Sequence, residues 1–538
     1  MTASVIPSAD SDESDRMTKY LIRRFLHGLF SVIVVVAIVM LLIYSCLDRQ
    51  LIFAQDPVYT QLGNNAKVLY QYRRWESFGY IDYVPYAEWL QEVATAGEIA
   101  PEEVQGLSAI GRKAADDEAS VASYVSRFTQ EYEAKGYKVI RLDAKLSKKK
   151  VAPGGNQALF AYKDKPLLGR LWKYLTGLLS VDNIHYVQED VGARGLTFTL
   201  HDPAYGGEKF APAVIGNGTL HKYLIYTDGR FPFIHQNLLT INLGKSYTVN
   251  SGVDVFESMN APQGSYVRST ITYPTGLVEE SADDLHTATY AAGSRESSRV
   301  NIDRFTDDYT AVTTAKSGLS QIGYSFVIGI ISSFLAYLLS VPMGIVMARK
   351  KDKLIDKIGT IYIIFIIAVP SLAYIFLFKA IGYAIGLPTT FNMDSNDWRM
   401  YVLPIVSLTL PSVAGLMKWL RRYMIDQMNS DYVKFARSGG LSEREIFSRH
   451  ILKNAIIPLV HGIPGTVLGS LVGAIITERV YVVPGAGNLL TKAINMYDNG
   501  VIVGVALFYA CLTVVSIILG DIMMSLVDPR INFTSKAR

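Results

Sequence analysis

The sequence DYVKFARSGGLSEREIFSRHILKNAIIP, residues 431–458, decides the fold. It predicts two short helices. Ser430 or Asp431 caps the first, and Gly439-Gly440 ends it with a sharp reversal that needs positive φ. Ser442 to Glu445 spells S-x-x-E, a capping box that starts the second helix. On that helix we expect Ile446, Phe447, His450 and Ile451 to share one face, and Glu445 to lie at the favourable i, i+4 spacing from Arg449.

This basic hairpin lies between two apolar runs that are long enough to cross a bilayer. One interpretation is an amphipathic segment that lies on lipid headgroups. The other is a rigid knob that fits a groove on a cytoplasmic partner. The residues of the hairpin leave both interpretations open.

Six windows lack Asp, Glu, Lys and Arg over the roughly 20 residues that span a bilayer core. They are Phe25–Leu47, Ile322–Ala348, Ile358–Phe378, Met400–Met417, Asn454–Thr477 and Asn499–Gly520. Hydrophobic residues make up 50% of the chain and charged residues 19%, values that fit a protein that is part membrane and part water-soluble. The formal net charge of +4 is too small to indicate a nucleic-acid partner.

The distribution of basic residues predicts the orientation in the membrane. Lys and Arg gather before the first window, between the second and third, and between the fourth and fifth, so both termini are expected in the cytoplasm. The resulting division is a cytoplasmic tail 1–24, a first span 25–47, an extracellular domain 48–316, a membrane core 319–526 and a cytoplasmic tail 527–538. Within the core, spans are expected near 319–348, 358–386, 400–424, 456–479 and 499–526, with the hairpin loop at 429–455.

The first window also has an alternative interpretation. Ile43 to Cys46 faintly resembles a bacterial lipobox, in which the cysteine is lipidated after cleavage, but Tyr44 is bulky for that site and the run is long for a signal peptide. We therefore expect an uncleaved anchor. The acidic stretch Ser8–Asp15 before it is expected to be a disordered tail.

The polar insertion of roughly 270 residues after the first window is long enough to bury its own core. Pro101 to Gly136 reads as helical with Gly136 as a C-terminal stop, and Asp228-Gly229 is a strong hairpin signal. The insertion contains no cysteine, so disulfides do not hold it together. A mixed α and β domain is expected.

No catalytic or energy-converting site stands out. Gly244-Lys245-Ser246 ends like a Walker A loop, but Leu239 occupies the position of the first glycine and the segment falls on the outer side. Neither a zinc-type cluster nor a catalytic triad is apparent. Lys379 and Asp521 come closest to charges within spans, and we expect Lys379 to extend outward and Asp521 to pair or cap near the cytoplasm. The chain is therefore expected to be non-catalytic and to bind no metal or cofactor.

The hairpin resembles the EAA loop of ABC-importer permeases in the oligopeptide and dipeptide branch. That branch typically reads Tyr-Val-x-x-Ala-Arg-x-x-Gly-Leu and then His-x-Leu-x-Asn-Ala. The matching positions are Tyr432, Val433, Ala436, Arg437, Gly440, Leu441, His450, Leu452, Asn454 and Ala455. Three positions depart from the general motif: Lys434 replaces its glutamate, Phe435 its first alanine, and Lys453 its late proline.

Flanking motifs agree in order and spacing with the same family. They are Pro370-Ser371, Leu403-Pro404, Leu410-Pro411, the element Glu478, Val480, Pro484, Gly485 and Gly487 with Tyr481 in place of phenylalanine, and finally Asp498, Asp521 and Asp528-Pro529-Arg530. Two parts of the insertion also resemble the shorter loop of the branch, namely Lys165–Leu168 and the Leu-Gly-x-Ser element Leu243–Ser246. Long insertions of this kind are similar to those of Gram-positive oligopeptide permeases.

The resemblance implies a fold with six transmembrane helices, the type I ABC-importer permease fold, carrying a large mixed α/β extracellular insertion. It implies that Tyr432, Ala436, Gly440 and Leu441 couple to an ATPase, with Ser442 to Leu452 as a lever. The remaining predicted members of the coupling loop are Val433, Arg437, Ser442, Glu445, Phe447, His450 and Leu452.

The implied partners are a second homologous permease, two ABC ATPases that bind ATP and Mg²⁺, an extracellular peptide-binding lipoprotein, the peptide and membrane lipid. The implied localisation is the plasma membrane, with several passes. A rival is an ABC-linked export or mechanotransmission subunit, but that class usually has four spans and lacks this loop. No residues for peptide binding can be named from the sequence.

Overall fold

The computed structural model describes residues 9–527, except 112–118, 148–149, 152–154, 187–192, 202–209, 218, 220–222, 227–237, 262, 266–268, 273–277, 282–317, 394 and 396. Two expectations lie outside this part of the chain: the turn at Asp228-Gly229, and the ending Asp528-Pro529-Arg530.

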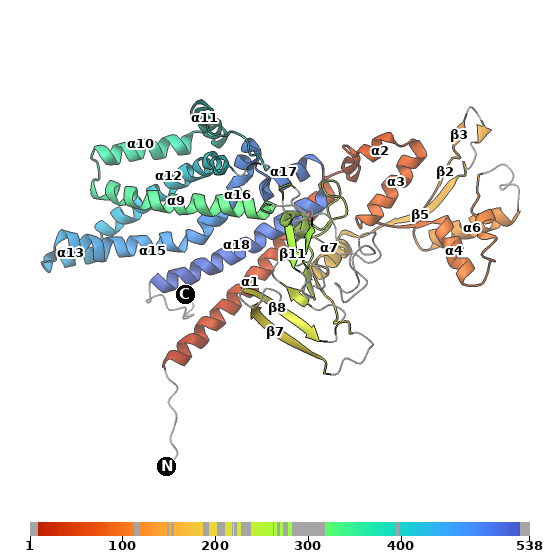
Figure 1. Cartoon of the computed structure of the whole chain (residues 1–538), viewed down its shortest axis with the longest axis horizontal. Helices are drawn as coiled ribbons and strands as arrows, with labels where there is room; N and C mark the ends of the chain where they lie inside the picture. The colour runs from red at the N-terminus through yellow and green to blue at the C-terminus, as the bar shows by residue number, and fades with distance from the viewer. Residues whose placement is uncertain are drawn as a thin grey trace, which may run out of the picture.

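Five helices in the described part are long and apolar enough to cross a membrane. They are α1 (Ala9–Cys46), α9 (Gln321–Arg349), α12 (Val402–Met428), α16 (Ile463–Tyr481) and α18 (Asn499–Val527). A bent pair, α10 (Leu354–Ala368) and α11 (Ser371–Ala384), makes six if the two count as one span. Figure 1 shows α9, α10, α12 and α16 side by side, with α1 running along α18.

The span expected at 358–386 is not one straight helix, because α10 and α11 meet at 109°. Pro370 has no N–H to continue the helix, and it disfavours helical geometry at the residue before it. Val369 is accordingly extended, with φ −84° and ψ 130°. The predicted Pro370-Ser371 motif is therefore the break between α10 and α11.

Two other boundaries differ from expectation. The acidic stretch Ser8–Asp15 is helical from Ala9 onward as part of α1, so the expectation of a disordered tail is wrong there. The span expected at 456–479 is divided at Gly462 into α15 (Lys453–His461) and α16.

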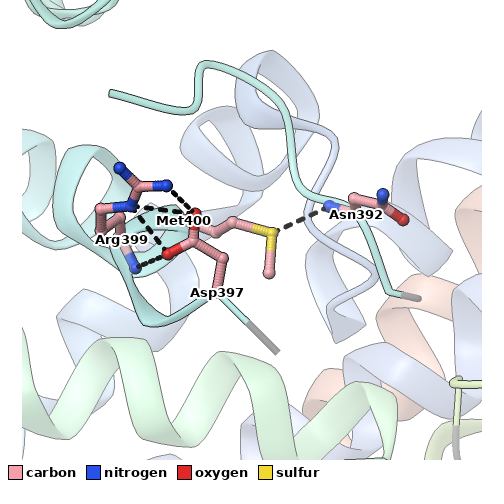
Figure 2. Close-up of polar contacts among 4 residues, drawn as sticks. All are labelled: Asn392, Asp397, Arg399 and Met400. Atoms are coloured by element: carbon pink, nitrogen blue, oxygen red, sulfur yellow. Dashed lines mark hydrogen bonds and ion pairs between the residues drawn. The ribbon is translucent and has the colours of Figure 1, made fainter. Parts of the chain in front are cut away.

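The connection from α11 to α12 folds back on itself through polar contacts (Figure 2). Asp397 caps a 3₁₀ turn, Trp398–Tyr401, by accepting a hydrogen bond from the backbone N–H of Arg399. The Arg399 guanidinium also donates to both carboxylate oxygens of Asp397, at 2.8–3.0 Å. The sulfur of the buried Met400 accepts from the Asn392 N–H. The charge of Arg399 is thus balanced within the connection.

The insertion between α1 and α9 begins with an α/β lobe. Its sheet is antiparallel in the order β1 (Ile81–Pro85), β5 (Ala158–Asp164), β2 (Lys138–Leu142), and Ile81 pairs with Asp164. One face buries Leu90, Phe128 and Leu159 with α4 (Tyr86–Thr95), α5 (Val104–Leu107) and α6 (Ala119–Ala134). The other face packs Phe160 against Tyr72 of α3 (Asn64–Ser77), with ring centroids 4.9 Å apart. Gly136, with φ 76°, follows α6 as the predicted C-terminal stop.

The rest of the insertion is mostly β structure, so the expected mixed α and β character is present in the described residues. Its helices are the 3₁₀ helix Arg49–Phe53, α2 (Pro57–Gln61), α7 (Leu167–Thr176) and α8 (Val255–Asn260). Three strand pairs are β3 (Leu146–Ser147) with β4 (Lys150–Val151), β6 (Leu179–Val181) with β10 (Leu239–Ile241), and β11 (Ser269–Thr272) with β12 (Val278–Ser281). A three-stranded sheet has the order β7 (Gly195–His201), β8 (Phe210–Asn217), β9 (Tyr223–Tyr226). In Figure 1 the lobe with α4 and α6 lies at one end of the long helices, and α13 (Asp431–Ser438) at the opposite end.

Candidate functional site

The hairpin predicted from the sequence is present, with one change at its first cap and one in its second half. Ser430 begins α13, but its hydroxyl donates to the Gln427 carbonyl at 2.6 Å and does not cap the helix. Gly440 supplies the positive φ, at 81°, while Gly439 has φ −76°. The capping box of Ser442 and Glu445 starts α14 (Glu443–Glu445).

The helix after the capping box continues as a π-helical segment, Ile446–Leu452, before it becomes α15. A π-helix bonds residue i to residue i+5, so side chains five apart lie on the same side. Ile446 and Ile451 are five apart, and both are buried. Phe447 and His450 are half-buried. The four residues thus share one face as expected, but the two buried residues on it are five positions apart, as a π-helix requires.

Buried side chains fix the hairpin to the long helices. Val433, Ile446 and Ile451 pack with Leu420 of α12 and Ala348 of α9. Val433 is 0% exposed, so it supports the hairpin from inside and is not available to a partner. The hairpin and α12 therefore form one packed unit.

Tyr432 adds a polar anchor beneath the hairpin. Its hydroxyl accepts from Asn454 Nδ2 at 3.0 Å, donates to Gln427 Oε1, and lies 3.4 Å from the His450 carbonyl oxygen. One side chain thus connects the end of α12, the π-helical segment and α15.

The exposed surface of the hairpin is apolar at its tip and basic around it. Phe435 is 76% exposed and Leu441 is 37% exposed, and Arg437, Arg444 and Arg449 are exposed as well. Ala436 and Leu452 are half-buried behind this tip. In the sequence Phe435 stands out only as a departure from the motif. An aromatic residue in a loop otherwise rich in charge was the signal that could have identified it.

The charges of the hairpin pair locally. Arg437 binds Glu443 through two hydrogen bonds, Nε–Oε1 at 2.6 Å and Nη2–Oε2 at 3.1 Å, which lower the pKa of Glu443. Glu445 accepts from the hydroxyl and backbone N–H of Ser442, and these bonds lower its pKa. Lys434, at the position of the motif's glutamate, pairs with Asp431 at 2.8 Å.

Glu478 explains the glycines that follow it in the sequence. Its buried carboxylate accepts from Ser325 Oγ at 2.5 Å and from the backbone N–H of Asn488 at 3.1 Å. A Cβ on Gly485 would collide with the Glu478 carboxylate, and one on Gly487 would lie 2.6 Å from the Ile475 Cα. The glycines let the start of α17 (Ala486–Asn495) close over Glu478. Pro484 precedes this closure.

Tyr481, which stands where the family usually has phenylalanine, uses its hydroxyl. The hydroxyl lies 3.0 Å from Ser407 Oγ of α12 and donates to the Ile375 carbonyl of α11 at 3.2 Å. Lys379 does not simply extend outward as expected, because its ammonium group donates to the Val480 carbonyl at 2.8 Å. The end of α16 is thereby bound to both α11 and α12.

Asp498 connects the insertion to α18. It is 0% exposed and accepts from the backbone N–H groups of Tyr247, Thr248 and Val249 at 2.8–2.9 Å. A Cβ on Gly504 of α18 would lie 2.6 Å from the Leu243 carbonyl oxygen. The Leu-Gly-x-Ser element, which resembled the end of a Walker loop, thus has a structural role: it packs against the start of α18.

Two ion pairs lie near the hairpin end of the bundle, and the sequence named the partner of neither one. The Arg421 guanidinium of α12 binds Asp356 of α10 through bonds of 2.6 and 2.7 Å. Asp521 of α18 accepts from Arg24 Nε and from the Tyr20 hydroxyl of α1, both at 3.0 Å, so the expected pairing of Asp521 is confirmed.

Pro411 lies inside α12, and the Tyr362 hydroxyl of α10 donates to the adjacent Leu410 carbonyl at 2.6 Å.

Among the described residues, no group of three or more His, Cys, Asp or Glu is arranged to hold a metal ion.

Comparison with known proteins shows what this architecture is similar to. Residues 340–533 match the family described as binding-protein-dependent transport system inner membrane component. The oligopeptide transport system permease protein AmiC of Streptococcus pneumoniae is 34% identical over 97% of this chain and 99% of its own length, so that match includes the insertion. The dipeptide transport system permease protein DppB of Lactococcus lactis is 31% identical over 39% of this chain and 69% of its own length. The oligopeptide transport system permease protein AppB of Bacillus subtilis is 29% identical over 40% of this chain and 71% of its own length.

Proposed function

The chain belongs to the family of binding-protein-dependent transport system inner membrane components and is a peptide ABC transporter permease with membrane-spanning helices; from this premise we propose that it forms half of a pathway for oligopeptide import. The protein is a multi-pass membrane protein of the plasma membrane. The substrate class is taken from the relative that matches almost the whole chain.

We propose an orientation in which both termini and the hairpin are cytoplasmic and the insertion is extracellular. In this division 1–24 and 527–538 are cytoplasmic tails, 48–316 is the extracellular domain, and 429–455 is the coupling loop. The opposite placement of α13 and of the lobe with α4 and α6 supports it. The basic residues on the hairpin side support it as well, because cytoplasmic loops are enriched in Lys and Arg.

The proposed partners follow from the same premise. A second homologous permease completes the pathway, and an extracellular lipoprotein delivers the peptide. Two ABC ATPases bind ATP and Mg²⁺, and this chain is a non-catalytic subunit.

The coupling proposal rests on one observation. The tip of the hairpin exposes apolar and basic residues, and buried residues of the hairpin fix that tip to the long helices. Phe435 and Leu441 face outward, while Val433, Ile446 and Ile451 pack into α9 and α12. An ATPase that moves against this tip would push a packed unit and not a flexible loop. Closure of the ATPases would then displace the long helices as rigid bodies, which is one form of alternating access.

The rival function, an ABC-linked export or mechanotransmission subunit, is less well supported. The described part of the chain has five or six apolar helices, against the usual four of that class. The similar proteins AmiC and DppB are both named as peptide permeases.

The test is co-purification of the ATPases with a Phe435→Glu variant, together with peptide uptake by cells that carry it. We expect both to fall at least tenfold. Trp398→Ala is the matched control, because Trp398 is a similarly exposed aromatic residue, at 72%, in the connection between α11 and α12. Normal ATPase association and uptake in Phe435→Glu would refute docking at this tip. A wild-type complex that imports no peptide would refute the proposed function itself.

A further inference from the structure

A hollow of about 430 Å³ opens between α11, α12 and α16. This volume lies within the usual range for ligand-binding clefts. None of the described residues that line it is charged. Seven of them carry hydroxyl groups: Ser371, Tyr374, Ser407, Ser412, Thr466, Ser470 and Thr477.

Two glycines keep this hollow open. Gly415 of α12 and Gly469 of α16 both line it, and a Cβ added to either would meet no atom within 4 Å. Glycine inside a helix is destabilising relative to alanine, so it usually has a reason in close packing. Gly329, Gly344 and Gly382 have that reason, since an added Cβ would lie within 3.1 Å of a leucine side chain. Gly415 and Gly469 have no such neighbour, and what they provide is space.

Thr477 points to a polar occupant for that space. It is 1% exposed, and its hydroxyl has no hydrogen-bond partner among the described residues. A buried hydroxyl without a partner is costly, and a lipid chain in the hollow would leave it unpaired. A ligand with hydrogen-bonding groups would satisfy it.

We propose that this hollow binds the main chain of the peptide during transport. Ser412 and Thr466 already donate to the carbonyls of Leu408 and Gly462. A hydroxyl oxygen that donates can still accept, so the lining matches the main-chain N–H groups that every peptide shares. A lining without charge does not select for charged side chains. The inference rests on the proposed function, and it adds a substrate-contacting surface to it.

Filling the hollow tests the proposal. We expect Gly415→Leu and Gly469→Leu to reduce peptide uptake at least tenfold in proteoliposomes that contain the complete transporter. The uptake of Gly469→Ala should lie between that of the wild type and that of Gly469→Leu. Co-purification of the ATPases and the ATPase activity without peptide should stay at wild-type levels. Ile361→Phe is the control, because it adds bulk to an exposed position of α10 that does not line the hollow.

A second variant tests the hydroxyl. Thr477→Val keeps the shape of the side chain, and we expect the KM for peptide uptake to rise several-fold with little change in assembly. A third measurement is protection of an introduced cysteine from labelling. The variant Gly469→Cys is made in a Cys46→Ser and Cys511→Ser background. Saturating peptide should slow its reaction with a maleimide at least fivefold.

The outcomes separate the two proposals. If the wild-type complex imports peptide and the leucine variants import it equally well, the hollow holds only lipid or water and this inference is wrong. A labelling rate that peptide does not change would contradict the inference in the same way. A wild-type complex without peptide uptake would instead contradict the proposed function.

Discussion

Ser246 donates a 2.6 Å hydrogen bond to the buried carboxylate of Asp498, although 252 positions separate the two residues in the sequence. Asp498 also accepts hydrogen bonds from three backbone N–H groups of the insertion. Together these bonds join the insertion to the first turn of α18. The Thr248 hydroxyl also lies 3.3 Å from Asp498 Oδ2, so five donors from the insertion converge on one carboxylate, and its removal should have a large effect.

We expect Asp498→Ala to destabilise the protein strongly. It leaves the Ser246 hydroxyl and three backbone N–H groups without their acceptor, and an unsatisfied buried group costs about 1–3 kcal/mol, so the total is on the order of 3 kcal/mol or more. Ser246→Ala removes one donor and should cost only about 1 kcal/mol. Thermal unfolding of the purified protein in detergent measures both. An Asp498→Ala protein as stable as Ser246→Ala would show that the junction is unimportant.

The pair of Asp356 and Arg421 should be strongly coupled. Asp356 is buried and bound by both arms of the guanidinium, so Asp356→Ala leaves Arg421 without its partner. Breaking a buried pair costs on the order of 3 kcal/mol, whereas removing both partners costs less than the sum of the single changes. A double-mutant cycle of Asp356→Ala and Arg421→Met, followed by thermal unfolding, measures the coupling. Additive effects would contradict it.

Tyr481→Phe restores the residue that is usual in the family. The change removes the bonds to Ser407 and to the Ile375 carbonyl, so we expect a loss of about 1 kcal/mol in stability with peptide uptake retained. Thermal unfolding and uptake assays are the measurements. A variant that is as stable as the wild type would show that the two bonds contribute nothing net.

The two glycines at the hairpin turn should respond differently to alanine. Gly440 has φ 81°, where a Cβ costs roughly 1–2 kcal/mol, so Gly440→Ala should weaken ATPase association several-fold. Gly439 has φ −76°, and its added Cβ would make only ordinary contacts, so Gly439→Ala serves as the control. Co-purification of the ATPases compares them. Equal behaviour of the two variants would mean that the reversal at Gly440 does not matter for docking.

Features set by neighbouring residues could be predicted from the sequence. The capping box needs only the three-residue spacing between Ser442 and Glu445, and it is present. The break at Pro370 follows from the chemistry of one residue, but the expected span at 358–386 ran through it, and its angle follows from no single residue. The identity of the family was also predictable, because several short motifs occur in order.

Features set by tertiary contacts could not be predicted. No sequence pattern indicates that Asp356 meets Arg421, because 65 positions separate them. The π-helical geometry of Ile446–Leu452 depends on the packing of Ile446 and Ile451 against other helices. The role of Phe435 was missed, since its exposure is a property of the folded hairpin.

The chemistry at Asp498 has a consequence for the exchange of extracellular domains between relatives. Three of the five donors that the insertion provides are main-chain amides, which every residue except proline possesses. The side chains at 247–249 can therefore change without loss of these bonds. A foreign insertion of different length or sequence should fit the same membrane core, provided that its last segment brings three consecutive amides and one hydroxyl to this carboxylate.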